Sequence, residues 1–124
     1  GQVISAHRLQ ALDEVNLKPG RVGGQFEALR ILDYCREQGL PVWVGGMFET
    51  SLGRLANLRL AARMLEAEAH DLSPSCRYFP RDLVANPLDM DSEGLIDLRG
   101  EGPAEIDETA LSELTTRRLE LVKK

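Results

Sequence analysis

The sequence has few cysteines and no long apolar run, and each shortage excludes a class of protein. The two cysteines, Cys35 and Cys76, lie far apart and form no Cys-x-x-Cys pair, so no zinc or redox motif is visible. No run of about 18 apolar residues could cross a bilayer, and residues 1–10 lack the basic-then-apolar order of a secretory signal. We therefore expect a cytoplasmic protein with reduced thiols and no membrane partner.

Basic residues are also in the minority. The chain has 15 Lys and Arg against 20 Asp and Glu, a net charge of −5. Because phosphate contacts need clustered basic side chains, we predict no nucleic-acid partner. What remains is ordinary for a globular domain: 124 residues, 43% hydrophobic and 28% charged, which is enough chain to bury one core.

Two buried strands, each followed by a glycine-rich turn, organise the first half. Val15 and Leu17 predict a strand over 13–17. Apolar residues at helical spacing then predict a helix that ends near Gly39. Residues 41–44 are the next strand, and their apolar character without alternation is typical of a parallel strand covered on both faces.

Helices flank this strand pair in the sequence pattern. A short helix is predicted over 5–12, before the first strand. A longer one is predicted over 51–69, with Thr50 or Ser51 as its cap. Its solvent side is expected to carry the charged residues, Arg54 among them.

The second half is richer in proline, glycine and acids. It predicts a short strand and loop over 71–75 and a helical turn over 78–83. A hairpin strand is expected over 95–98 and a closing helix over 109–122.

The alternation of strands and helices predicts an α/β fold with a parallel sheet. Two or three such units cannot cover their own sheet and would leave strand edges unpaired. A complete (β/α)8 barrel takes about 250 residues, roughly twice this length. We therefore expect this chain to be part of a larger structure.

Four segments carry a family resemblance. NLKPGRVGG at 16–24 and PVWVGGMFETSLGR at 41–54 resemble the sixth and seventh barrel strands and their loops in the enolase superfamily, within its family of o-succinylbenzoate synthases and N-acylamino acid racemases. SPSCRYF at 73–79 resembles the eighth-strand segment less closely, and residues 94–105 resemble the glycine-rich tail.

The resemblance implies a partial (β/α)8 TIM-type barrel, about strands six to eight, with a C-terminal extension that returns towards a capping domain. Residues 1–85 would form the βα units. Residues 86–124 would be a tail packed on the barrel or on the capping domain.

The resemblance also implies proton-transfer chemistry. In this family a divalent metal, normally Mg²⁺, binds an enolate intermediate, and two lysines move the proton alpha to a carboxylate. Lys18 matches the sixth-strand lysine, whose amine can act as acid or base; without the resemblance, a lysine at a strand end is an ordinary surface residue. The other lysine and the three acidic metal ligands belong to earlier strands. The only acids before Lys18 are Asp13 and Glu14, at the wrong end of its strand, so we assign no metal ligand here and expect no activity from the chain alone.

Other residues match the substrate cavity of this family. Gly45, Gly46 and Met47 would line it, because glycine allows close approach of the main chain and methionine adapts to an acyl group. Glu49 either orients the catalytic lysine or a loop, or lies in the first turn of a helix. Arg21 either pairs with a substrate carboxylate or the barrel rim, or is a surface residue.

Three functions follow from this resemblance. The first is dehydration through an enediolate to o-succinylbenzoate, in menaquinone synthesis, with a small carboxylate as substrate. Racemisation of N-acylamino acids uses the same intermediate and is the close alternative. The third is a non-catalytic barrel fragment that associates with the missing N-terminal part or with itself, since exposed strand edges predict a homo-oligomer. Phosphate binding is disfavoured because no Gly-x-Gly-x-x-Gly order exists.

Overall fold

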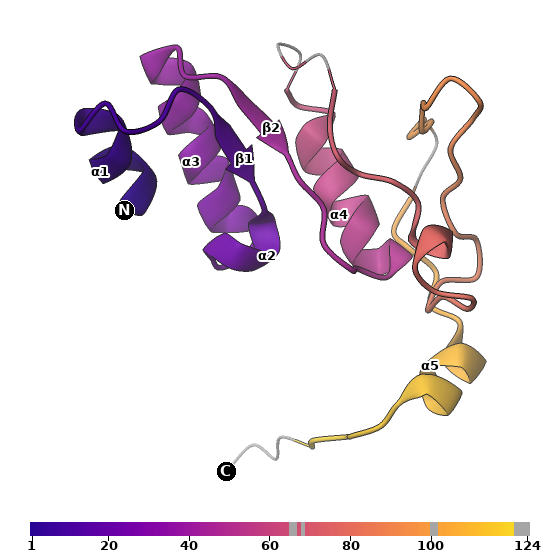
Figure 1. Cartoon of the computed structure of the whole chain (residues 1–124). Helices are drawn as coiled ribbons and strands as arrows, with labels where there is room; N and C mark the ends of the chain where they lie inside the picture. Colours follow the sequence, from indigo (N-terminus) through magenta and orange to yellow (C-terminus); the bar gives the residue numbers. More distant parts are fainter. Residues whose placement is uncertain (65–66, 68, 100–101, 121–124) are drawn as a thin grey trace.

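A computed structural model of the chain (Figure 1) describes residues 1–64, 67, 69–99 and 102–120. Strands and helices alternate through the first half, whereas the second half is mostly without regular elements (Figure 1). The order is α1 (Gln2–Arg8), β1 (Val15–Leu17), α2 (Pro19–Val22), α3 (Gln25–Gln38), β2 (Val42–Val44), α4 (Ser51–Ala61), a 3₁₀ turn η1 (Ser75–Arg77) and α5 (Glu108–Leu114).

The two strands form a parallel pair, as predicted. Val15 pairs with Val42 and Leu17 with Val44, and the connection between the strands runs through α2 and α3. A parallel bridge between Gly45 and Asp71 extends the pairing to a third segment, in the region predicted as a short strand. The chain is thus a run of βα units, which is the repeating element of a TIM-type barrel.

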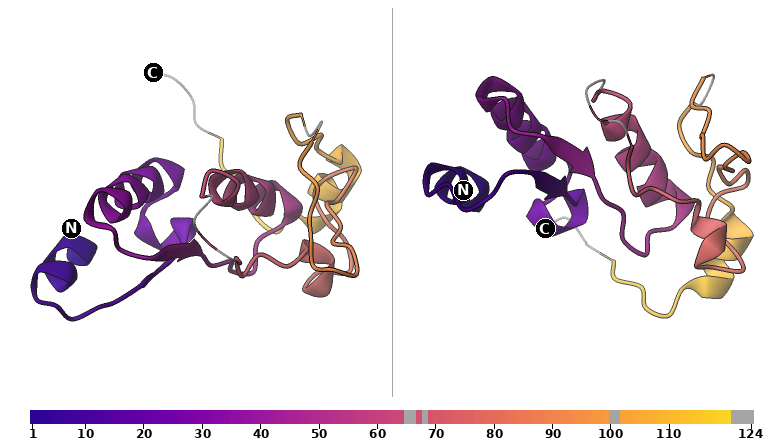
Figure 2. Two further views of the ribbon diagram at one scale, coloured as in Figure 1. Left: turned by 90° about the horizontal axis from the view of Figure 1, so that it is seen from above. Right: turned by 45° about the horizontal axis from the view of Figure 1, so that its top comes forward.

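One face of the strands is covered by helices. Helices α3 and α4 lie on the same side of β1 and β2 (Figure 2). Leu17 and Val44 on the strands join Leu32 and Cys35 on α3 in one buried cluster. The opposite face carries Asn16 and Trp43, which are partners in the register. Alternation of side chains along each strand therefore separates a core face from a face that would line the barrel interior.

The helix ends in this half follow local chemistry. α3 ends at Gly39, whose φ of 65° is the left-handed conformation that glycine adopts without strain. α4 ends at Ala61, earlier than the predicted 69, because Met64 donates to the Ala61 carbonyl in a tight i to i+3 turn; residues 65, 66 and 68 lie outside the described residues. Thr50 is the N-cap residue of α4, one of the two predicted, but its side chain makes no capping hydrogen bond. Asp82 accepts from the Ser51 amide instead.

The first helix and the tail differ more from the sequence pattern. α1 lies over Gln2–Arg8 instead of 5–12, and the helical turn is at Ser75–Arg77 instead of 78–83. The predicted strand over 95–98 is wrong: these residues form no ladder, and Val84 pairs instead with Ile106 in an isolated antiparallel bridge.

The closing helix is shorter than the pattern predicted. α5 covers Glu108–Leu114, and residues 115–120 are not helical; 121 and 122 lie outside the described residues. Within the described ranges, no helix is both long and apolar enough to cross a membrane. The division at residue 85 stays a prediction.

Candidate active site

Lys18 lies at the carboxyl end of β1, where the strand turns into α2. It is the N-cap residue of α2, with φ −112° and ψ 99°, and Pro19 begins the helix. Proline suits this position because its fixed φ matches the first helical turn. The Lys18 side chain is half-buried, and Nζ donates to the Gly46 carbonyl over 2.9 Å. The two strand ends are therefore joined through the ammonium group.

Gly45 and Gly46 follow β2 at the same edge, and neither has room for a side chain. A Cβ on Gly45 would overlap the Asn16 side chain and would lie 3.0 Å from Lys18 Nζ. A Cβ on Gly46 would overlap the Arg54 guanidinium and would lie 2.9 Å from the backbone oxygen of Asp71. The sequence predicted that these glycines let the main chain approach a ligand. In the structure they let it approach the side chains of Lys18 and Arg54.

A cavity of about 420 Å³ opens in front of Lys18. Of the predicted site residues, Arg21, Gly46 and Met47 line it with Lys18, whereas Gly45 and Glu49 do not. The other lining residues, which the sequence did not single out, are Phe48, Asp71 and Tyr78. The cavity thus combines two cations, one carboxylate, two aromatic rings and a thioether.

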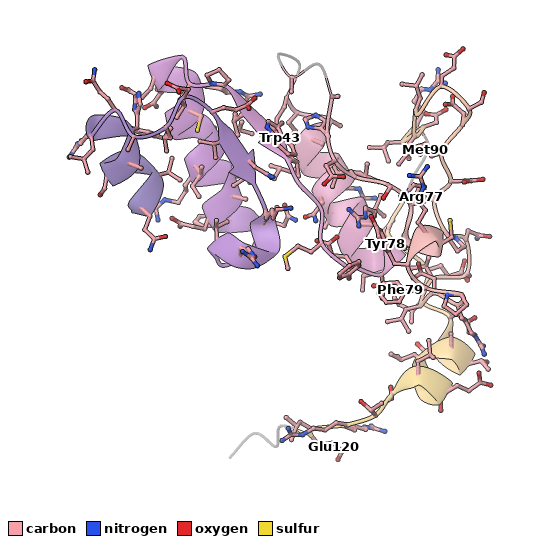
Figure 3. All side chains as sticks on the ribbon, in the orientation of Figure 1. Trp43, Arg77, Tyr78, Phe79, Met90 and Glu120 are labelled. Carbon is pink, nitrogen blue, oxygen red and sulfur yellow. The ribbon has the colours of Figure 1, made fainter. Side chains whose placement is uncertain are left out.

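The two aromatic rings form one wall. Phe48 and Tyr78 meet edge to face, with ring centroids 5.1 Å apart, the preferred geometry for such pairs. Figure 3 shows Tyr78 beside the N-terminal end of α4, and its hydroxyl hydrogen-bonds Ser73 at 2.8 Å. Tyr78 belongs to the segment 73–79, which resembles the eighth strand, so this segment contributes to the cavity.

Arg54 is the main residue that the sequence reading placed wrongly. It was expected on the solvent side of its helix, yet it is 1% exposed. Its Nη2 donates to the Met47 carbonyl over 2.7 Å and lies 3.0 Å from Glu49 Oε2. The guanidinium carbon lies 6.0 Å from the Tyr78 ring centroid, within cation–π range.

Glu49 holds the turn after β2 together. One carboxylate oxygen accepts from the Met47 amide at 2.9 Å, and the other accepts from Asn57 Nδ2 at 3.1 Å. Asn57 Oδ1 in turn accepts from Gln25 Nε2 at 2.8 Å, at the start of α3. Of the two roles that the sequence left open for Glu49, this geometry favours orientation of a loop.

Other groups with proton or metal chemistry lie apart from this cavity. Burial raises the pKa of the Cys35 thiol, so it is a poor nucleophile. The described residues contain no group of three or more side chains able to hold a metal ion, so Mg²⁺ does not fit the part of the chain that the structure shows. A cavity of about 610 Å³ at the other end of the strands is lined by Glu14, Leu40 and Pro41 among others and has no comparable polar set.

The fold gives the class first: parallel βα units with a lysine at the carboxyl end of a strand are consistent with part of a TIM-type barrel. Residues 2–103 match the family described as Enolase C-terminal domain-like. The chain therefore belongs to the enolase superfamily, as part of its C-terminal barrel domain.

Relatives with named functions support this placement. An N-succinylamino acid racemase from Amycolatopsis is 48% identical over 64% of this chain and 22% of its own length. An o-succinylbenzoate synthase from Listeria innocua is 40% identical over 71% of this chain and 24% of its own length. The chain thus spans about a quarter or less of the curated relatives it matches.

Solved structures agree in fold. A member of the enolase superfamily from Listeria innocua has a TM-score of 0.81 and 34% identity over 90% of this chain and 30% of its own. A probable mandelate racemase from Alicyclobacillus acidocaldarius has a TM-score of 0.79 and 38% identity over 93% of this chain and 31% of its own.

Proposed function

We propose that this chain is the C-terminal barrel part of an enzyme of the o-succinylbenzoate synthase type. In that enzyme Lys18 either moves the proton alpha to a carboxylate or stabilises the negative charge that forms when the proton leaves. The observation that carries the proposal is the place of Lys18: at a strand end, half-buried, tied to Gly46, and on the wall of a cavity of about 420 Å³. A positioned amine supplies about 10²- to 10⁴-fold in such a proton transfer.

The lining of the cavity favours a small carboxylate as substrate. Lys18 and Arg21 bring two cations to it, and Arg can bind a carboxylate through paired N–H donors. Met47, Phe48 and Tyr78 add apolar surface suited to an acyl or aryl group. The site residues proposed for the substrate are therefore Arg21 and the turn 45–47, with Glu49 behind them.

Mg²⁺ dependence belongs to this proposal through the family alone. The described residues contain no group of three or more side chains that could hold a metal ion, and we propose that the metal ligands belong to the earlier strands of the barrel, as the family resemblance implies. The same holds for the second lysine. We accordingly propose no activity for the 124 residues by themselves.

The closest alternative is racemisation of an N-acylamino acid. It is favoured by two relatives that are N-succinylamino acid racemases, from Amycolatopsis and from Thermus thermophilus, 48% and 39% identical. Both reactions remove a proton alpha to a carboxylate, so Lys18 serves either one. In the racemase reaction it would take or deliver the proton on one face, and in the synthase reaction it would stabilise charge.

A complete barrel tests both reactions. Residues 2–103 would replace the matching C-terminal segment of the Listeria innocua synthase, and the chimera would be assayed with Mg²⁺ for dehydration, for racemisation and for exchange of the alpha hydrogen in D₂O. We expect Lys18→Ala to lower the competent reaction about 10²- to 10⁴-fold, with Arg30→Ala as an exposed control. Unchanged turnover in Lys18→Ala would refute the assignment, and the ratio of the two products would separate synthase from racemase.

A second candidate is a fragment that self-associates. It is favoured by the sheet itself, since among the described residues β1 pairs on one edge only, and an unpaired edge can recruit another strand. Light scattering during size-exclusion chromatography would test it. A particle of 13.8 kDa across micromolar concentrations would count against it.

A further inference from the structure

Arg54 is a buried charge that the proposed reaction does not use directly. Its side chain is 1% exposed, and among the described residues its Nε and Nη1 have no hydrogen-bond acceptor. A buried ion pair seldom stabilises a fold more than apolar residues of the same size would, and unpaired buried N–H groups are costly. Stability alone is therefore a weak explanation for an arginine here.

The contacts of Arg54 converge on one short turn. It donates to the Met47 carbonyl over 2.7 Å and pairs with Glu49 over 3.0 Å. Its guanidinium also fills the space where a Cβ on Gly46 would lie. A planar group with fixed donors sets the direction of its partners more strictly than a flexible ammonium does. Arg54 thus fixes the backbone of residues 46–49.

The same turn holds Lys18. Lys18 Nζ donates to the Gly46 carbonyl over 2.9 Å, and Arg54 donates to the next carbonyl along the chain, that of Met47. Two cations therefore bind successive peptide groups, Lys18 from β1 and Arg54 from α4. The orientation of the Gly46 carbonyl, and with it the place of Nζ, depends on how Arg54 holds the neighbouring peptide.

A second route ties the two loops together. Glu49, the ion-pair partner of Arg54, accepts from Asn57, and Asn57 accepts from Gln25 at the start of α3. Gln25 is the first residue of α3, and the short connection through α2 joins it to Lys18. A connected polar network of this kind makes one arrangement of both loops more rigid than separate hydrogen bonds would.

We propose that Arg54 is a positioning residue, which fixes the turn 46–49 and thereby holds Lys18 Nζ at the mouth of the cavity. This rests on the proposed function for the role of Lys18, but the holding of Nζ can be tested without any activity. The chain has three lysines, Lys18, Lys123 and Lys124, so the reactivity of Lys18 can be measured against the other two.

The test is amine labelling of the full chain with trinitrobenzenesulfonate, followed by peptide mass spectrometry. In Arg54→Met we expect the labelling rate of Lys18, relative to Lys123 and Lys124, to rise about threefold or more, the size of effect that loss of one hydrogen bond gives. Arg54→Lys keeps a charged donor and should return the ratio to within about twofold of the parent chain. Arg30→Met, on the exposed face of α3, should leave it unchanged.

The design separates positioning from folding. Circular dichroism checks each variant, and the double variant Glu49→Gln with Arg54→Met removes both charges together, so that no carboxylate loses its partner. The proposal is overturned if the labelling rate of Lys18, relative to Lys123 and Lys124, stays as in the parent chain in a folded variant that carries Arg54→Met, alone or with Glu49→Gln. An equal rise in Arg30→Met overturns it as well.

Activity gives an independent readout in the complete barrel. Arg54→Met should lower kcat about tenfold, because the variant misplaces the proton-transfer group. KM should rise by less than kcat falls, because Arg21 lines the cavity from outside the turn that Arg54 fixes. An unchanged kcat would count against positioning. If no variant or parent turns over either substrate, the proposed function fails, while the labelling result still decides whether Arg54 holds Lys18.

Discussion

The first 72 residues and the described residues after them, called the tail below, are stabilised by different interactions. Apart from Leu55, Val84 and Ala110, the buried hydrophobic residues form one cluster, and all of its members lie between Val15 and Leu72. The tail buries Val84 and Ala110 and packs Leu88, Ile96 and Leu98 against the edge of that cluster. Its turns depend on aspartates that bond local backbone amides: Asp91 accepts from the amides of residues 93 and 95, and Asp107 caps α5 through Ala110. Burial therefore dominates in the part that carries Lys18, whereas the tail combines a few apolar contacts with local polar bonds.

The strongest test of this comparison removes the same atoms from each region. Leu32 is 1% exposed and Leu95 is 62% exposed. Leu32→Ala should lower the free energy of unfolding by about 2–5 kcal/mol, because it leaves a cavity in a packed core, whereas Leu95→Ala should change it by less than about 0.5 kcal/mol. Urea denaturation followed by Trp43 fluorescence measures both, and similar losses at the two positions would show that the tail is also held by burial.

The same difference explains which elements the sequence predicted. The two strands, α3 and the start of α4 were predicted because apolar periodicity and burial agree there. The tail was predicted less well. A few backbone hydrogen bonds between irregular segments hold the 3₁₀ turn and the Val84–Ile106 bridge. Asp91 shapes the turn before residues 95–98 through side-chain bonds to the backbone. None of these bonds leaves a periodic signal in the sequence.

The candidate site divides in the same way. Lys18, Arg21, Gly46 and Met47 lie together as the family resemblance implied, but their roles stay predictions. Arg54 was missed because an arginine was assumed to face solvent. Its position in the helix indicates burial, because it lies about one turn from Ser51 and Leu58 and next to Leu55, which are all buried. These residues share one face of α4.

The place where the tail meets the first region offers an intermediate effect. Asp82 accepts from the Ser51 amide over 3.0 Å and from its hydroxyl over 2.7 Å, so a tail residue caps α4. Asp82→Ala should cost about 1 kcal/mol of stability, the usual value of a lost cap. Asp33→Ala, exposed on α3, is the matched control. Equal urea midpoints for the two variants would show that the tail leaves α4 unsupported.

The smallest expected effect lies within the first region and depends on pH. Burial lowers the pKa of His70, partly offset by a backbone hydrogen bond, and its Nδ1 accepts from the Val44 amide at 3.2 Å. Because the folded state favours the neutral ring, the unfolded chain binds more protons below about pH 6.5, and stability falls as pH is lowered through that value. His70→Gln should reduce the loss between about pH 7.5 and pH 5.5. Since His70 bonds the Val44 amide on β2, a loss that persists undiminished in His70→Gln would show that the pH-sensitive contact lies elsewhere in the chain.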